Sequence, residues 1–237
     1  MNEIRSKDHI CFVSLDNKRN NYLDTPEFVD AETLNNIVTK DKCKAIIITG
    51  RNRHFSAGAN LDNLRLMAKN GSLKEEINKG KKLLTLLKSF NLPIIACIEG
   101  ACFGGGLEIV LNADVKIAGK KALFAFPESN LNLIPGLGGT LNLSKITGKT
   151  KALEIILAGD IIDAETAYDL KIIDYLVEDK SSLEEGLSLA KTLTANKDID
   201  IIKAVIEAVR NASELPYEQA LERETELFCM LAENAMK

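Results

Sequence analysis

One stretch of the sequence, residues 98–128, most constrains what this chain can fold into. It holds the only run of three glycines, Gly104–Gly106, between an apolar run, Pro93–Ile98, and a second run, Gly106–Asn112. The first run predicts a buried strand and the second a helix. Residues without Cβ at a strand-to-helix turn let a polarised oxygen approach the first helical amides, which have no intrahelical acceptor. The stretch therefore predicts an oxyanion site in outline.

Two glutamates frame this turn. Glu108 lies in the first turn of the predicted helix, and Glu128 follows Pro127 at the end of the apolar run Leu123–Phe126. Taken alone, Glu108 is explained as an acid that complements the helix dipole, and Glu128 as a loop carboxylate. Two acids on either side of a predicted oxyanion turn are better explained as an acid/base pair.

A second loop, residues 51–60 (RNRHFSAGAN), follows the β-branched run Lys44–Thr49, which predicts a strand covered on both faces. Small residues at Ala57, Gly58 and Ala59 leave its backbone uncovered, which suggests a second place where backbone meets ligand. A plain strand-to-helix turn explains this loop equally well when it is considered by itself. A phosphate loop at residues 148–150 is rejected, because Leu143 occupies the position of the required glycine.

Composition narrows the class of protein. The chain has 237 residues, 46% of them hydrophobic, which suffices for one substantial core. A net charge of -4 argues against a nucleic-acid partner, and no apolar run is long enough to cross a membrane. The polar first residues predict no signal peptide, and five cysteines without metal-ligand spacing indicate a reduced cytoplasmic protein without a bound metal.

The pattern of elements changes near residue 180. Before it, strands and helices alternate, and Ser72 with Glu75 forms a capping box that should start a long helix ending near Phe90. After it, the period is helical throughout. The sequence therefore predicts a mixed α/β core at residues 1–179 and an all-helical region at residues 180–237, whose three helices are expected at residues 182–194, 199–209 and 217–234.

Four segments together resemble a known family. In order, they are HFSAGANL, IEGACFGGGLEIVLNADVKIA, FPESNLNLIPGLGGT and LAGDIIDAETA. Their order and spacing resemble the crotonase superfamily, and within it the enoyl-CoA hydratases, over residues 10–234. The resemblance implies an α/β fold, a crotonase-like spiral of repeated ββα units. It also implies an all-α C-terminal region that builds homotrimers, often paired into hexamers.

The resemblance also implies roles for particular residues. The family's oxyanion hole matches the backbone amides of Ala59 and Gly105, and its catalytic glutamates match Glu108 and Glu128. Further substrate contacts are expected at Ser56, Ala57, Gly58, Asn60, Leu61, Gly104 and Pro127. The implied reaction is reversible syn addition of water to a trans-2-enoyl thioester, with coenzyme A as part of the substrate and no other cofactor.

Three alternatives remain open. A family isomerase needs only one carboxylate, so the presence of both glutamates argues against it. A dehydratase acting on an acyl-carrier thioester is a second, and a catalytically idle protein that acts as a scaffold or RNA binder is a third. The sequence does not fix acyl chain length, branching, pathway or direction.

Some positions depart from the family pattern. Asn60 stands where aspartate is usual, and can still cap a following helix; Asn132 stands where glycine is usual, and asparagine tolerates positive φ. The Arg-Pro pair that the family usually has after the first strand is missing, and so is part of the terminal segment. Both departures affect how the chain is expected to bind the carrier of the acyl group. Basic residues that could meet its phosphates are Lys18, Arg19, Arg51 and Arg53.

Overall fold

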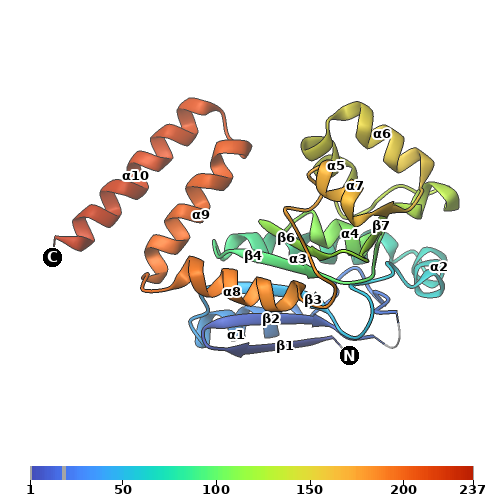
Figure 1. The fold of residues 1–237 in the computed structure, drawn as a ribbon, viewed down its shortest axis with the longest axis horizontal. Coiled ribbons are helices and arrows are strands. Elements are labelled where there is room, and N and C mark those ends of the chain that lie inside the picture. The colour runs from blue at the N-terminus through green and yellow to red at the C-terminus, as the bar shows by residue number, and fades with distance from the viewer. Residues whose placement is uncertain (1, 18–19, 237) are drawn as a thin grey trace.

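The computed structural model describes residues 2–17 and 20–236, and its main layer is a six-stranded sheet (Figure 1). Strand β1 is antiparallel to its neighbour β2, and the other strands run parallel. In spatial order the strands are β1 (Glu3–Lys7), β2 (Ile10–Leu15), β3 (Ala45–Gly50), β4 (Ile94–Ile98), β6 (Val115–Gly119) and β9 (Tyr175–Val177).

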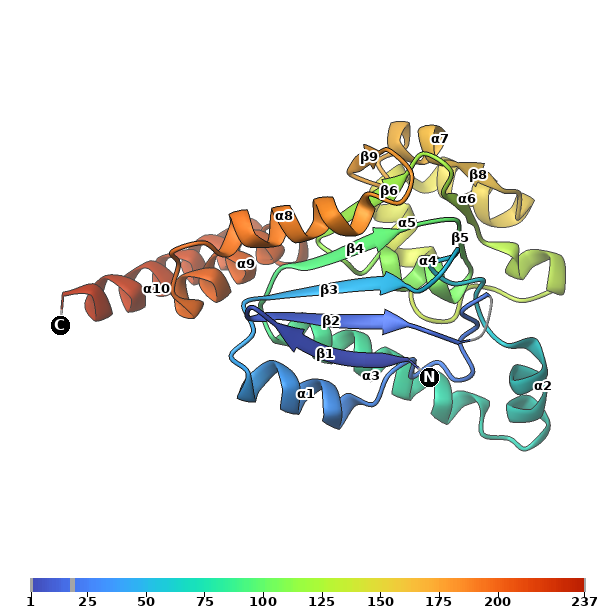
Figure 2. The same cartoon turned by 60° about the horizontal axis from the view of Figure 1, so that its bottom comes forward.

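The helices pack around this sheet or extend from it (Figures 1 and 2). They are α1 (Ala31–Lys40), α2 (Leu61–Lys69), α3 (Leu73–Ser89), α4 (Gly105–Val110), α5 (Gly139–Thr147), α6 (Lys149–Ala158), α7 (Ala164–Asp169), α8 (Ser182–Thr194), α9 (Ile199–Glu214) and α10 (Tyr217–Ala235), with a 3₁₀ helix, η1 (Pro127–Leu131). In the described part of the chain, none of them is long and apolar enough to cross a membrane.

Both faces of the sheet are covered, as the β-branched run of β3 predicts. Ile46 and Ile48 belong to the large core cluster that includes residues of α1 and α3. Ile47 points to the other face, in a smaller cluster that α8 covers through Ala190 and its neighbours. Successive side chains of a strand point to opposite faces, so a continuous apolar run is stable only between two layers.

A second, smaller layer makes the repeat visible. Strands β5 (Ala101–Phe103), β7 (Leu123–Ala125) and β8 (Ile162–Asp163) form a three-stranded sheet. Isolated bridges between Ser56 and Cys102, and between Leu23 and Ala59, extend this layer to the loops that follow β3 and β2. Each turn of the chain thus places a strand in the large sheet, a short extended segment in the small layer and then a helix. This arrangement is the spiral of ββα units expected from the resemblance.

The C-terminal helices divide into two kinds. Helix α8 lies on the large sheet, whereas α9 and α10 form an antiparallel hairpin that extends away from it (Figures 1 and 2). The helical character expected from residue 182 onward is therefore confirmed. The division of the chain into separate units at residues 179 and 180 stays a prediction.

Several elements were not anticipated from the sequence, including β8 and η1. Strand β1 is polar and half exposed, because it lies at the edge of the sheet and pairs only with β2. Strand β5 is only three residues long and directly follows Gly100. Helix α2 has no fully buried residue, although its apolar side chains gather on one face. Short or edge elements carry little periodic signal, and tertiary pairing decides them.

The predicted capping box at Ser72 is wrong, although the helix does begin there. The Ser72 backbone has φ -86° and ψ -7°, which is helical rather than the extended conformation of a capping residue, and its side chain makes no capping hydrogen bond. Its amide donates to Met67 O at the end of α2 instead. Glu75 pairs with Lys79 rather than reaching back to the helix start.

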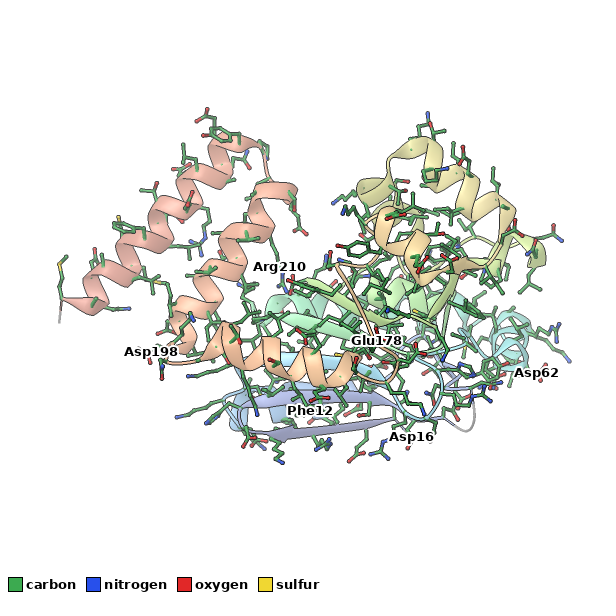
Figure 3. All side chains as sticks on the ribbon, viewed as in Figure 1. Phe12, Asp16, Asp62, Glu178, Asp198 and Arg210 are labelled. Carbon is green, nitrogen blue, oxygen red and sulfur yellow. The ribbon has the colours of Figure 1, made fainter. Side chains whose placement is uncertain are left out.

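Arg210 fastens the helical hairpin to the core (Figure 3). Its guanidinium donates to both carboxylate oxygens of Asp114, at 2.9 and 2.7 Å, and to the carbonyls of Lys88 and Leu92. Asp114 also accepts from the amide of Ile94 at the start of β4. The arginine side chain is only 13% exposed. All three of its guanidinium nitrogens donate hydrogen bonds in this contact.

We expect Arg210→Met to lower the free energy of unfolding by about 3 kcal/mol, because it leaves a partly buried Asp114 without its cation. Arg223→Met is the matched control on α10, since Arg223 is 43% exposed and pairs with Glu207 and Glu226 at the surface. That control should cost much less, because water screens an exposed ion pair. Denaturant unfolding of both variants measures the difference, and equal losses would contradict an anchoring role for Arg210.

Candidate active site

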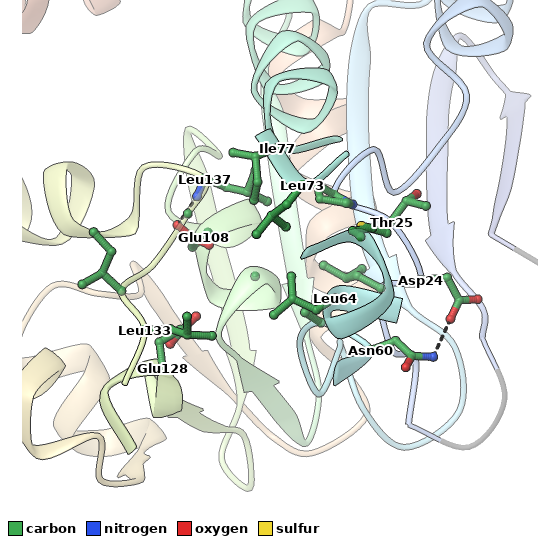
Figure 4. A pocket seen from close by; sticks show the side chains of 17 residues that line it. Asp24, Thr25, Asn60, Leu64, Leu73, Ile77, Glu108, Glu128, Leu133 and Leu137 are labelled. Carbon is green, nitrogen blue, oxygen red and sulfur yellow. Dashed lines mark hydrogen bonds between the residues drawn. The ribbon is translucent and has the colours of Figure 1, made fainter. Parts of the chain in front are cut away.

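A cavity of about 170 Å³ lies where the two predicted loops meet (Figure 4). Its wall contains the four residues expected at the reaction centre: Ala59, Gly105, Glu108 and Glu128. Most of the remaining wall is leucine, isoleucine and methionine from α2, α3 and residues 133–137. The two loops that the sequence singled out separately therefore face one apolar space.

The additional substrate contacts expected from the resemblance are only partly at this cavity. Asn60 lines it, and Ala57 lines a larger, open cavity of about 1210 Å³ on the other side of the loop, together with Arg53. The wall of neither cavity includes the other expected contacts, which are Ser56, Gly58, Leu61, Gly104 and Pro127.

Glu108 is buried but well supported. Its side-chain atom Oε1 accepts hydrogen bonds from the amides of Leu137, at 2.6 Å, and Gly139, at 2.8 Å. Gly139 is the first residue of α5, so the carboxylate lies at the positive end of a helix dipole. Burial raises the pKa of Glu108, while the amides and the charge of Lys81 oppose that rise. The supporting amides favour the ionised form, as a base requires.

Glu128 lies in η1 and is less well supported. Burial, and then the negative charge of Glu108, raise its pKa to about 7. Its atom Oε2 is buried and has no hydrogen-bond partner among the described residues. A buried carboxyl oxygen without a partner is uncommon and is typical of a functional group. This carboxyl group holds a proton far more readily than an exposed glutamate does.

The glycine triplet fits closely around Glu128. Gly104 has φ 50° and ψ -122°, which side chains rarely adopt, and a Cβ there would lie 2.8 Å from Glu128 Oε1. Gly105 is the first residue of α4, where helix geometry leaves the amide without an intrahelical acceptor. The turn therefore presents an unused amide beside the second glutamate.

The amide of Ala59 is oriented by its pairing with Leu23. Leu23 N donates to Gly58 O at 2.9 Å, and Leu23 O accepts from Asn60 N at 2.8 Å. In this parallel bridge, Leu23 bonds to the carbonyl of Gly58 and to the amide of Asn60, the residues on either side of Ala59. The amide of Ala59 itself therefore points away from Leu23. Ala59 lines the cavity, which leaves this amide as the second donor available to a bound carbonyl oxygen.

A buried polar network supports this loop and was not predicted from the sequence. Asn21 is fully buried with φ 52°, and its Nδ2 donates to the carbonyls of Arg51 and His54, each at 2.7 Å. Its own carbonyl accepts from Ser56 Oγ at 2.7 Å, and that hydroxyl accepts from Gly58 N at 3.1 Å. Asn21 and Ser56 thus fix the backbone immediately before Ala59. The one sequence feature that marks this network is the pair of asparagines at residues 20 and 21, in a polar loop.

The expected effects of the two unusual asparagines are confirmed. The side chain of Asn60 accepts from the amides of Asp62 and Asn63 and so caps α2. It also donates to Asp24 at 2.9 Å, and both residues line the cavity (Figure 4). Asn132 adopts a left-handed conformation with φ 56°, where glycine would otherwise be needed.

The basic residues expected to meet the carrier are differently placed. Arg51 pairs with Glu3 and Asp16 at the surface, so its charge is already engaged. Arg53 faces the larger cavity described above. Lys18 and Arg19 lie outside the described residues.

The chain is similar to known proteins in sequence and in fold. The chain is 33% identical over 185 residues to a protein named probable enoyl-CoA hydratase of Bacillus subtilis (strain 168), covering 78% of this chain and 72% of the relative. It is 32% identical over 195 residues to 2,3-dehydroadipyl-CoA hydratase of Escherichia coli (strain K12), covering 82% and 74%. A solved enoyl-CoA hydratase from Polaromonas sp. JS666 matches with a TM-score of 0.89 and 25% identity, covering 97% of this chain and 90% of that one.

The spiral of ββα units and the cavity between its turns define a protein of the crotonase fold. The family described as enoyl-CoA hydratase/isomerase matches residues 5–236, nearly the whole chain. The chain therefore belongs to the enoyl-CoA hydratase/isomerase family.

We expect Glu128→Gln to stabilise the protein increasingly as the pH rises. The folded state holds the Glu128 proton up to about pH 7, whereas the unfolded chain releases it near the ordinary glutamate value. The stabilisation that the retained Glu128 proton gives the wild-type protein is therefore fully present below about pH 4.5. It is lost as the pH rises through 7, and the free energy of unfolding falls by up to about 3 kcal/mol. Glutamine does not titrate, so the variant escapes this loss.

Denaturant unfolding between pH 5 and pH 8 checks this expectation. The difference in unfolding free energy between Glu128→Gln and wild type should grow over that range and level off above pH 7. Glu222→Gln, an exposed position on α10, is the control. A constant difference between variant and wild type across the range would show that Glu128 is not held protonated by the fold.

Proposed function

We propose that this protein catalyses the reversible syn addition of water across the double bond of a trans-2-enoyl-CoA. The observation that carries the proposal is the pairing of two unlike carboxyl groups in one apolar cavity. Glu108 is supported by amides that favour its ionised form, and Glu128 has a pKa raised to about 7. When the surroundings of two carboxyl groups favour the ionised form of one and the protonated form of the other, the first can act as a base and the second as an acid.

The thioester carbonyl would accept hydrogen bonds from the amides of Ala59 and Gly105. Addition at C3 places negative charge on this oxygen, and amides fixed in advance stabilise that charge without rearranging. Removing one such donor typically costs about 3 to 4 kcal/mol in the transition state. The helix dipole of α4 adds to the stabilisation at Gly105.

Glu108 would position the attacking water and take its proton. Its Oε1 is already held by two amides, so Oε2 is the oxygen left to hold water beside C3. Glu128 would deliver a proton to C2 through the carboxyl group whose Oε2 has no partner. Both side chains enter from the same wall of the cavity (Figure 4), which is consistent with addition to one face of the double bond.

The finer parts of the proposal concern the carrier and the assembly. The family name and the relatives' names support coenzyme A as the carrier, and an acyl-carrier thioester is the alternative donor. We propose that no cofactor beyond the substrate's coenzyme A takes part and that the protein works in the cytoplasm. The exposed apolar side chains Val209 and Phe228, on α9 and α10, support assembly into a homotrimer or a hexamer.

We expect Glu108→Gln and Glu128→Gln each to lower kcat for hydration by about 10² to 10⁴-fold, because the amide keeps the shape but not the proton chemistry. Binding of a saturated acyl-CoA should change little. The assay follows loss of the conjugated enoyl absorbance of crotonyl-CoA. A 3-enoyl substrate provides the opposite test, since an isomerase would create that absorbance. Near-normal hydration by either variant would remove that glutamate from the mechanism.

Ser56→Ala should lower kcat by about 10-fold or more while KM changes less, because Ser56 acts only by fixing the loop that carries Ala59. Amide exchange at Gly58 should accelerate in the same variant, since its acceptor is lost. Ser144→Ala, at an exposed position on α5, is the control. Unchanged kcat together with faster exchange at Gly58 would show that loop order is not needed for the reaction.

A further inference from the structure

The part of the cavity beyond the two glutamates determines which acyl group can react. We infer, on the basis of the proposed function, that this site takes a short, uncharged acyl group of about four to six carbons in total. We further infer that Ile77 on α3 sets the limit. Three observations carry the inference: the size of the cavity, the support of its far wall and the charge of its lining.

The size of the cavity allows few carbons. Its volume is about 170 Å³, and it must hold the reacting carbons and a water molecule as well as the rest of the acyl chain. For comparison, an apolar cavity of about 150 Å³ in another protein accommodates benzene, which has six carbons. The space past C3 is therefore sufficient for only a few methylene groups.

The far wall is a close contact between α3 and the loop before α5. A Cβ added to Gly136 would lie only 3.1 Å from Cδ1 of Ile77, so the loop backbone packs directly on this side chain. Beyond that loop lies a separate cavity, whose wall includes Lys81 and Arg210. It shares Ile134, Gly136 and Leu137 with the first cavity. The loop and Ile77 thus separate two spaces, and only the first contains the glutamates.

This wall cannot move aside without disturbing the base. The loop residue Leu137 donates the 2.6 Å hydrogen bond to Glu108 Oε1, and Gly139 donates the second. A longer acyl chain that displaced the loop would remove amides that keep Glu108 ionised. Chain length and base strength are therefore coupled through the same few residues.

The charge of the lining excludes an acyl group with a terminal carboxylate. The ionisable residues among the described members of the cavity wall are Asp24, Glu108 and Glu128, and none of those members is a lysine or an arginine. A second carboxylate in this apolar space would lose its hydration and find no lysine or arginine in the wall to pair with. Lys81 lies in the wall of the other cavity, and Arg210 is already paired with Asp114.

The test is a panel of trans-2-enoyl-CoA thioesters with 4, 6, 8, 10 and 12 acyl carbons, together with 2,3-dehydroadipyl-CoA, which has six carbons and a terminal carboxylate. We expect kcat/KM to be highest at four or six carbons and to fall by about 10-fold or more at ten. The carboxylate substrate should be about 100-fold poorer than its uncharged six-carbon counterpart. Equal kcat/KM from four to ten carbons, or equal use of the carboxylate substrate, would overturn the inference.

Ile77→Ala tests the limiting residue, because it opens the wall where the acyl chain should end. The variant should shift the best substrate to a longer chain, and Ile77→Val should shift it less. Leu86→Ala is the matched control, since Leu86 is a half-buried residue of the same helix outside the cavity wall. An unchanged chain-length profile in Ile77→Ala, with its fold verified by circular dichroism, would exclude Ile77 as the limit.

Binding separates this inference from the proposed reaction. Dissociation constants of butyryl-, hexanoyl- and decanoyl-CoA, measured by calorimetry, report the acyl space without any turnover. Preference for the short chains supports the inference even if no thioester in the panel is hydrated, an outcome that would overturn the proposed hydration alone. Equal binding of all three chains would overturn the inference even if hydration is rapid.

Discussion

The removal of two carboxyl groups from water is the constraint on which the rest of this structure depends. Glu108 is 2% exposed and would be costly as an anion without the two amides that reach it from the next turn of the spiral. Glu128 receives less support and so retains its proton more strongly. The difference between the two groups comes from the backbone around them, because the side chains are chemically identical. The amide at the start of α5 donates to Glu108, whereas the turn at Gly104 packs closely against Glu128.

Local sequence rules were sufficient for the parts of the fold that are strongly periodic or that need glycine. The continuous apolar run of β3 requires cover on both faces, and both clusters that provide it are present. Gly104 has a conformation that excludes a side chain, so the glycine triplet was a dependable marker of the turn. Asn60 and Asn132 behave as their side-chain chemistry predicts, the first as a cap and the second at positive φ.

Parts of the site that depend on distant contacts could not be predicted. Asn21 sits in a polar loop, and only its burial against residues 51–56 reveals that it supports the oxyanion loop. Leu137 contributes its backbone amide, which every residue except proline possesses, so no sequence signal marks it. Ser72 and Glu75 have the spacing of a capping box, yet the tight connection after α2 places Ser72 in a helical conformation. Tertiary packing outweighs the local preference there.

The described residues that line the cavity with the two glutamates all fall between Leu23 and Leu137. During synthesis the chain emerges from its N-terminus, so every cavity-lining residue is available before α6 to α10 have been made. The helical hairpin, held to the core through Arg210, contributes nothing to the cavity wall within one chain. Substitutions on the exposed faces of α9 and α10 can therefore accumulate without changing any side chain that lines the cavity.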